Sequence, residues 1–158
     1  QRQMCIRDRL TVCLTITGIY DFVIIVRDNG PGHRVTVNTN SSLTDWLAQN
    51  LDSRDLILTP EYSISEVTMA GVMMYLGWPY YAWSAGYDTY DRAEKAKEIY
   101  TSQEPERVKS LVRQEGITYI LFEEGMTFEG ETCIETTIKS VYRLVYQSED
   151  RRIRIYET

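Results

Sequence analysis

Apolar and polar positions follow helical and strand-like periods in turn over most of the chain. A helical spacing of apolar residues predicts five helices, which begin near residues 42, 63, 91, 105 and 131. Short apolar runs bounded by turn-forming residues predict strands at residues 34–38, 55–59, 117–122, 141–146 and 153–156. Because helices and strands alternate, the pattern indicates a three-layer α/β fold. We expect a mostly parallel sheet with helices on both faces and a C-terminal antiparallel hairpin.

Several of these helices carry recognisable end signals. Ser42 is expected to cap the first of them, and residues 63–66 form a capping box for a helix that extends to about Met74. Pro105 is suited to the first turn of a helix, and Gly116 is suited to its end.

The most apolar stretch of the chain, residues 10–26, lies near its start. It is slightly shorter than the roughly 20 residues that a bilayer span needs, and Asp21 interrupts it. We interpret it as the end of a transmembrane helix; a buried strand, a core helix and a signal peptide are the alternatives. Residues 1–9 resemble a translated sequencing-adapter remnant and are treated as an artefact tail. Residues 27–33 then form a linker, and residues 34–158 form the α/β domain.

Composition excludes several classes of function. A net charge of −6 argues against a nucleic-acid partner, which would need a basic face. The three cysteines, Cys5, Cys13 and Cys133, form no CxxC pair, and His33 is the only histidine, so neither a disulfide framework nor a metal site is predicted. The chain has no glycine-rich phosphate-binding loop, and we expect no cofactor.

An aromatic segment is the most distinctive feature. Seven of the eighteen aromatic residues lie between Tyr75 and Tyr90. Tyrosine and tryptophan combine an apolar face with a polar tip, so this loop could pack on the sheet edge, contact a membrane interface or a partner, or stack on sugar rings. The candidate binding residues in it are Trp78, Tyr80, Tyr81, Trp83 and Tyr87.

Polar residues at the carboxyl ends of the strands form a second candidate site. Ligands of such sheets bind outside these ends, where we place Glu61 and Glu123, with Ser84 and Asp88 joining them from the aromatic segment. Carboxylates here suit acid–base work, which defines a rival hypothesis of a soluble α/β enzyme. Ser84 also approximates a nucleophile elbow, although the only histidine precedes it, against the usual chain order. The alternative for Asp88 and Asp91 is helix capping.

The order of five segments resembles a known family. These are residues 43–47, 55–59, the segment Gly77-Trp-Pro-Tyr-Tyr-Ala-Trp-Ser-Ala-Gly-Tyr-Asp88, residues 116–122 and the hairpin ending at residues 155–156. From residue 10 onward the chain is similar to the C-terminal extracytoplasmic domain of bacterial polytopic membrane proteins related to the GT-C glycosyltransferases.

The resemblance implies a function for the whole protein rather than for this domain alone. GT-C enzymes use polyprenyl-phosphate sugars and carry their catalytic acid in an early loop between membrane helices, so no catalytic residue is expected here. The implied partners are the membrane, the missing transmembrane part, and a glycan or polyprenyl-phosphate sugar. The implied place is the extracytoplasmic side of the cell membrane. A protein-interaction module is a further alternative.

Overall fold

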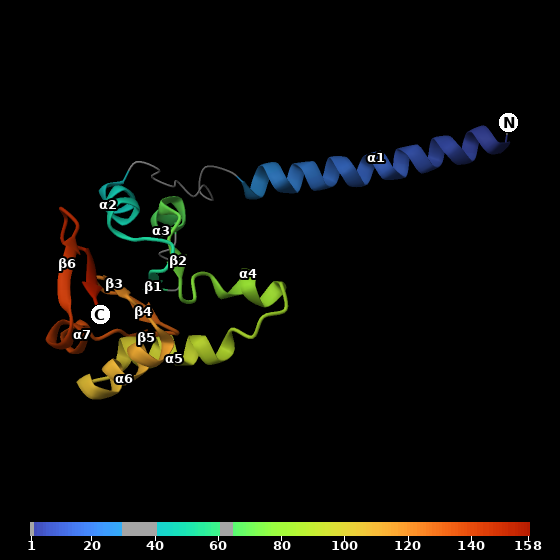
Figure 1. Ribbon diagram of the computed structural model, residues 1–158. Coiled ribbons are helices and arrows are strands. Elements are labelled where there is room, and N and C mark those ends of the chain that lie inside the picture. Colours follow the sequence, from blue (N-terminus) through green and yellow to red (C-terminus); the bar gives the residue numbers. More distant parts are fainter. Residues whose placement is uncertain (1, 30–40, 61–64) are drawn as a thin grey trace. The chain divides into compact units, whose positions relative to one another are not determined.

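The structure is a computed structural model that describes residues 2–29, 41–60 and 65–158 (Figure 1). The chain divides into two compact units, Gln1–Thr36 and Val37–Thr158, and each is described by itself.

The first unit contains one long helix, α1 (Arg2–Asp28), of 27 residues. The apolar stretch 10–26 is therefore helical rather than a strand. Its exposed large apolar side chains are Ile16, Ile19, Tyr20, Phe22, Val23, Ile25 and Val26. As far as the described residues go, no helix is both long and apolar enough to cross a membrane.

The second unit is an α/β domain. Its helices are α2 (Ser42–Asn50), α3 (Ser65–Ala70), α4 (Pro79–Ser84), α5 (Tyr90–Thr101), α6 (Pro105–Glu115) and α7 (Glu135–Val141). Its strands are β1 (Leu56–Leu58), β2 (Met73–Met74), β3 (Tyr119–Glu123), β4 (Thr127–Phe128), β5 (Glu131–Thr132), β6 (Arg143–Gln147) and β7 (Ile153–Glu157).

Five strands form the central sheet in the order β2-β1-β3-β7-β6. Strand β1 runs parallel to both β2 and β3, with Ile57 opposite Tyr119. Strand β7 runs antiparallel to β3, with Tyr156 opposite Ile120, and pairs with β6 to complete the C-terminal hairpin. Strands β4 and β5 form a separate antiparallel pair. The predicted combination of parallel strands and a closing antiparallel hairpin is confirmed.

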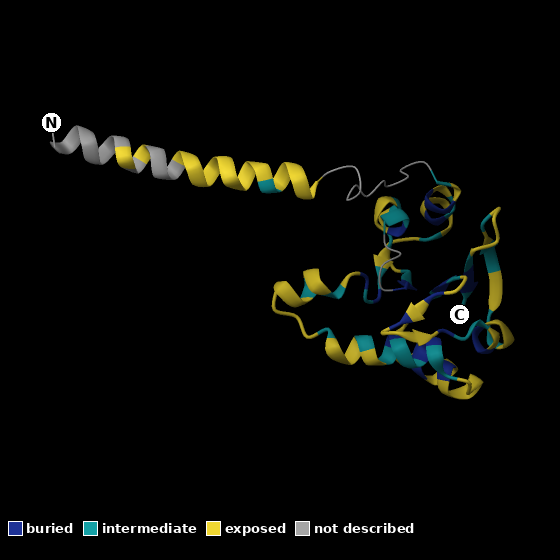
Figure 2. Ribbon diagram, turned by 180° about the vertical axis from the view of Figure 1, so that it is seen from behind, coloured by how far each residue is buried: buried dark blue, intermediate teal, exposed yellow. Residues whose placement is uncertain are grey.

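The hydrophobic core lies on both faces of this sheet. Successive side chains of a strand point to opposite faces. In β3, Ile120 and Phe122 therefore join a cluster with residues of α5, α6 and α7, whereas Leu121 joins a second cluster with Leu47 of α2 and Val67 of α3. Figure 2 shows the buried residues along the strands and on the inner sides of these helices. The expected three layers, with helices on both faces, are confirmed.

Tyr100 of α5 ties two neighbouring strands together. Its side chain is fully buried, and its hydroxyl lies 2.7 Å from the carbonyl oxygen of Leu121 and 3.2 Å from that of Leu58. These carbonyls belong to β3 and β1, near the carboxyl ends of both strands. Burial raises the pKa of Tyr100 well above its ordinary value, so the hydroxyl stays protonated and can donate.

Helix α6 forms as its sequence predicts. It begins at Pro105, whose ring fixes a helical φ, and Val108, Leu111 and Val112 are buried. Gly116 follows it with φ 68°, a left-handed conformation that favours glycine, and its N–H donates to the carbonyl of Val112.

Three other predicted boundaries are wrong. The helix expected to reach Met74 ends at Ala70, because Gly71 takes a left-handed φ of 74° and Met73–Met74 then pairs with β1 as an edge strand. The helix expected at 131–139 begins only at Glu135, because residues 131–132 pair with β4.

The third correction concerns the first cap. Ser41 rather than Ser42 caps α2, and its hydroxyl accepts a hydrogen bond from the Thr44 N–H. The predicted strand at 34–38 and residues 63–64 of the capping box lie outside the described residues.

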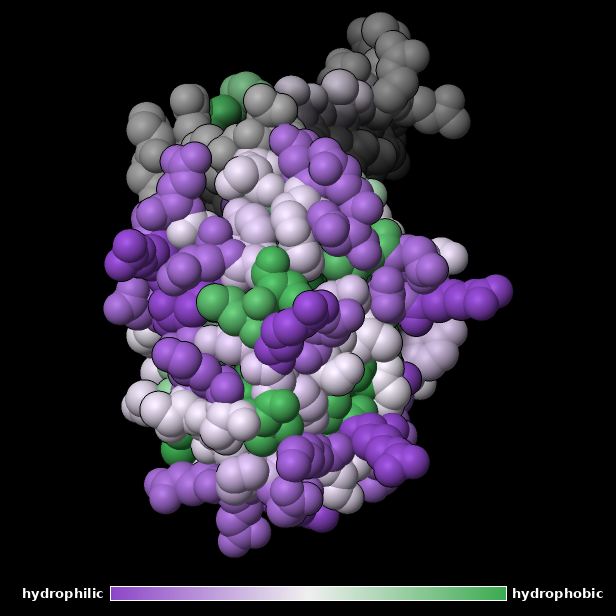
Figure 3. Space-filling model, turned by 60° about the vertical axis from the view of Figure 1, so that its left-hand side comes forward, coloured by the Kyte–Doolittle hydropathy of each residue, from purple (hydrophilic) through white to green (hydrophobic). Residues whose placement is uncertain are grey.

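The side of the domain seen in Figure 3 is mainly hydrophilic, with hydrophobic residues in small separate groups. Such scattered apolar groups are normal for a protein surface and indicate no particular partner.

Candidate functional site

The aromatic segment forms an arm that projects from the domain (Figure 1). We define this aromatic arm as residues 76–89. It contains helix α4, in which Pro79 occupies the first turn, so the expectation of a loop throughout is wrong. None of the α4 residues is buried. The short helix is therefore held by its ends rather than by a core of its own.

The aromatic side chains of the arm are largely exposed. The exposed fractions are 44% for Trp78, 59% for Tyr80, 68% for Tyr81, 64% for Trp83 and 70% for Tyr87. Packing of these rings over the sheet edge, one of the three interpretations drawn from the sequence, is therefore wrong. Of the seven aromatic residues in the segment, Tyr75 is the one that lies in the core.

The exposed rings contact one another along α4. The centroid of the Trp78 ring lies 6.0 Å from that of Tyr81, and the centroid of the Tyr80 ring lies 6.0 Å from that of Trp83. Tyr80 and Tyr81 are a further pair in edge geometry at 6.3 Å. Contacts of this kind orient aromatic side chains while leaving much of their faces accessible. Tyr80, Tyr81 and Trp83 thus lie on one short helix, and Trp78 is its N-cap.

A polar cluster fixes the base of the arm. We call Tyr75, Arg92, Lys95 and Glu115 the base cluster. The Tyr75 hydroxyl donates to Oε2 of Glu115 at 2.9 Å, and Nζ of Lys95 lies 2.8 Å from Oε1 of the same carboxylate. The Lys95 ammonium, together with the Tyr75 hydroxyl, holds the pKa of Glu115 below its ordinary value. At neutral pH the cluster therefore contains a carboxylate whose two oxygens are both satisfied.

An apolar groove runs between the arm and α3. Its volume is about 520 Å³, and its lining includes Thr68, Met69, Met74, Leu76, Trp78 and Tyr81. The methionines come from α3 and β2 and the rings from α4. The sequence prediction missed these methionines because it extended one helix through Met74 and so did not place a strand edge beside the arm.

Ser84 and Asp88 have structural partners within the arm. Ser84 is the last residue of α4, and its hydroxyl donates to the carbonyl of Tyr81 at 2.9 Å. A nucleophile elbow needs a serine on a strand-to-helix turn, so that hypothesis is wrong. Asp88 accepts a hydrogen bond from the Tyr90 N–H at 3.0 Å, but the N-cap of α5 is Thr89, so Asp88 lies one residue before the predicted capping position. Asp91 instead pairs with Lys95 at 2.7 Å.

The second predicted site, at the carboxyl ends of the strands, is only partly described. Glu61 lies outside the described residues. Glu123 ends β3, where it pairs with Ile153 of β7, and its carboxylate lies 4.0 Å from the Arg152 guanidinium. Ser84 and Asp88 belong to the arm, on other elements.

Thr59 follows β1 at the same edge of the sheet. Its side chain is 1% exposed, and its hydroxyl makes no hydrogen bond within the described part of the chain. This part also holds no group of three or more histidine, cysteine or acidic residues arranged to bind a metal ion.

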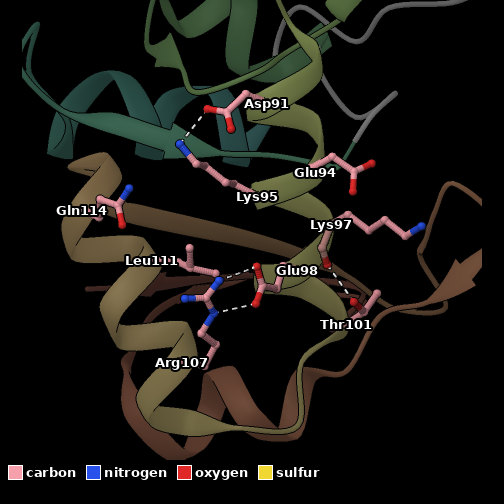
Figure 4. Close-up of a pocket in the computed structure, with 9 residues that line it drawn as sticks. All are labelled: Asp91, Glu94, Lys95, Lys97, Glu98, Thr101, Arg107, Leu111 and Gln114. Carbon is pink, nitrogen blue, oxygen red and sulfur yellow. Dashed lines mark hydrogen bonds and ion pairs between the residues drawn. The ribbon is translucent and has the colours of Figure 1, made fainter.

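A polar groove between α5 and α6 is filled by ion pairs (Figure 4). The guanidinium of Arg107 donates to both oxygens of Glu98 at 2.6 and 3.0 Å, and the Arg107 contact lowers the pKa of Glu98. Lys95 faces Asp91 at the other end of this groove. The Arg107–Glu98 and Lys95–Asp91 pairs of this groove are already formed between its own residues, and the first of them joins α6 to α5.

Comparison with known proteins bears on the fold. No family model matches the chain, and no curated protein matches it. Among solved structures, the C-terminal globular domain of an oligosaccharyltransferase (AglB) from Archaeoglobus fulgidus is similar, with a TM-score of 0.52 and 13% sequence identity. The similarity covers 79% of this chain and 99% of that one. At this identity the likeness shows the fold, and the chain shares the mixed α/β fold of that globular domain.

Proposed function

We propose that this chain is a non-catalytic extracytoplasmic domain of a membrane glycosyltransferase-like protein. The observation that carries the proposal is the likeness to nearly the whole globular domain of the archaeal oligosaccharyltransferase, an enzyme of the GT-C-like kind. The order of motifs in the sequence supports the same family independently of that likeness. We extend the proposal to a bacterial polytopic parent.

Helix α1 supports a place at the membrane. Seven of its large apolar side chains are exposed between Ile16 and Val26, and a helix of this composition is stabilised by a lipid or protein environment rather than by water. In this proposal α1 is the end of a membrane helix, and the α/β domain lies on the extracytoplasmic side.

The role proposed for the domain is to help place the acceptor or the lipid-linked sugar. Trp83 and Tyr80 present exposed ring faces, which suit contact with a sugar ring. Ser84 and Asp88 of the arm hydrogen-bond to backbone groups. In this proposal the domain contributes binding, and the chemistry belongs to the rest of the parent protein.

Topology provides the test of placement. The full chain is expressed in a bacterium with its C-terminus fused either to alkaline phosphatase, which is active only outside the cytoplasm, or to a fluorescent protein that matures only inside it. We expect the fusions to fractionate with membranes and only the phosphatase to be active. Recovery in the cytosol with a bright fluorescent fusion would overturn the proposal.

Binding is tested separately on the full chain in detergent, with a polyprenyl-phosphate sugar as the probe and tryptophan fluorescence as the readout. The Trp83→Ala and Tyr87→Ala variants should weaken binding. Leu144→Ala, which alters an exposed apolar side chain on β6, is the matched control and should leave binding unchanged. Equal binding by all three variants would remove the arm from the proposed role.

A further inference from the structure

Apart from Asp88 near its end, the aromatic arm belongs to a stretch of chain without charge. From Val67 to Tyr87, 21 consecutive residues include no lysine, arginine, aspartate, glutamate or histidine, although a quarter of the whole chain is charged. The same stretch contains no asparagine or glutamine. It spans most of α3, the edge strand β2 and the whole of α4, so these uncharged residues lie at and around the β2 edge of the sheet.

The surface that results is apolar with polar tips. Beside the exposed rings of α4, the Met69 and Met73 side chains are 55% and 60% exposed. Every large exposed side chain of the arm is a tryptophan or tyrosine, which carries an N–H or O–H at its end. The groove between α3 and the arm adds concave apolar area to this surface.

This chemistry discriminates between classes of partner. The stretch 67–87 offers a free oligosaccharide only hydroxyls, indole N–H groups and backbone groups, and none of the side-chain amides, carboxylates or guanidinium groups that pair with two sugar hydroxyls at once. A site for an anionic lipid surface needs lysine and arginine, which the stretch also lacks, and the net charge of −6 opposes such a surface.

The neutral headgroup layer of a bilayer matches the arm. Tryptophan and tyrosine are enriched at that level because their apolar bodies meet the acyl boundary while their polar tips stay hydrated. Between Leu76 and Tyr87 the arm carries no charged side chain, and a zwitterionic headgroup layer carries no net charge, so docking of this part of the arm desolvates no unpaired charge of the protein.

We propose that the aromatic arm docks the domain on the membrane by lying in the headgroup layer of a zwitterionic bilayer. This rests on the proposed function, in which α1 brings the domain to the membrane. It places the exposed rings at the level where the sugar of a lipid-linked donor sits.

The experiment uses the full chain with Trp46→Phe, which leaves Trp78 and Trp83 as the only tryptophans. Trp46 packs against Tyr119 and Tyr146, so phenylalanine keeps an aromatic ring there. The protein is reconstituted in phosphatidylcholine vesicles, with or without bromine atoms on the acyl chains. We expect bromolipid to quench the fluorescence and vesicles to protect it from acrylamide. High salt should change neither the bromolipid quenching nor the protection from acrylamide. Added phosphatidylglycerol should not increase either effect.

Variants test the arm itself. Tyr81→Asp and, independently, Tyr87→Asp place a charge on the exposed arm and should reduce bromolipid quenching by at least about threefold. Leu144→Asp, on the exposed β6 edge, should leave it unchanged. Circular dichroism verifies that each variant keeps its fold.

Two failures are distinguishable. If the protein floats with vesicles but Trp78 and Trp83 remain open to acrylamide and are not quenched by bromolipid, the docking proposal is overturned while membrane attachment stands. If the protein does not float with vesicles at all, the proposed function fails as well. A fluorescence shift with free oligosaccharide, in a protein whose tryptophans bromolipid leaves unquenched, overturns docking in favour of a sugar site.

Discussion

Arg92 lies against Tyr75, and this contact joins the two ends of the aromatic arm. The guanidinium carbon of Arg92 is 5.3 Å from the centroid of the Tyr75 ring, and Nη1 donates to the Tyr75 carbonyl oxygen at 3.0 Å. Tyr75 precedes the arm and Arg92 follows it on α5. The arm thus leaves the core and returns to it at one place, and residues 76–89 between these points present their rings outward.

The Arg92→Ala substitution should loosen the base of the arm. It removes a cation–π contact and a hydrogen bond, which together are worth about 1 kcal/mol of unfolding free energy. Hydrogen–deuterium exchange should be faster at residues 76–89 and unchanged in β3. Arg113→Ala, which removes an exposed arginine on α6, is the control. It should change neither the unfolding free energy nor the exchange rate at residues 76–89. Unchanged exchange in the arm of the Arg92 variant would contradict this role.

Glu115 should make stability depend on pH. Its pKa is lowered in the folded state, mainly by Lys95, so the unfolded state binds a proton more readily than the folded state does. The carboxylate therefore stabilises the fold above the ordinary glutamic acid pKa of about 4.3, and this contribution is lost as the pH falls through the lowered pKa.

Urea unfolding of wild type and Glu115→Gln measures that contribution. We expect the variant to be less stable by about 1 kcal/mol at neutral pH, and the difference to shrink towards zero in acid. Glu124→Gln, at an exposed turn, should show no comparable difference. If the difference in unfolding free energy between wild type and Glu115→Gln does not depend on pH, the Lys95–Glu115 ion pair is not the cause of that difference.

Tyr100→Phe should destabilise the centre of the sheet. The substitution removes the hydroxyl that donates to the Leu58 and Leu121 carbonyl oxygens. Both buried carbonyls then lose this hydrogen-bond donor. A loss of about 1–3 kcal/mol in unfolding free energy is expected from thermal or urea denaturation. Tyr142→Phe alters a half-buried tyrosine and should cost less than about 0.5 kcal/mol. Equal losses in the two variants would be inconsistent with a bridging role for Tyr100.

Gly116 should resist substitution for conformational reasons alone. A Cβ atom at this position would meet no other atom within 4 Å, but φ is +68°. Gly116→Ala should therefore lower the unfolding free energy by about 1–2 kcal/mol, and Gly116→Asn by less, because asparagine tolerates the left-handed region. The order of the two melting temperatures checks this, and an alanine variant as stable as wild type would contradict it.

The elements that local sequence predicts well are those whose signals are self-contained. Helix α6 has proline at its start, glycine after its end and an apolar stripe between them, so no distant residue is needed to define it. Strand β3 is likewise an apolar run, and β7 follows a turn and alternates apolar with charged residues. The α/β class follows from their order.

Tertiary structure decided the remaining features, because they depend on residues far apart in the chain. Met73–Met74 is a strand only because β1 supplies its hydrogen-bonding partner, and residues 131–132 are a strand only because β4 does. The exposure of Trp83 and Tyr81 also could not be read from their order. An aromatic run has the same composition whether it is packed or projecting, and the exposure of its rings depends on how its two ends, joined by the Tyr75–Arg92 contact, leave the core.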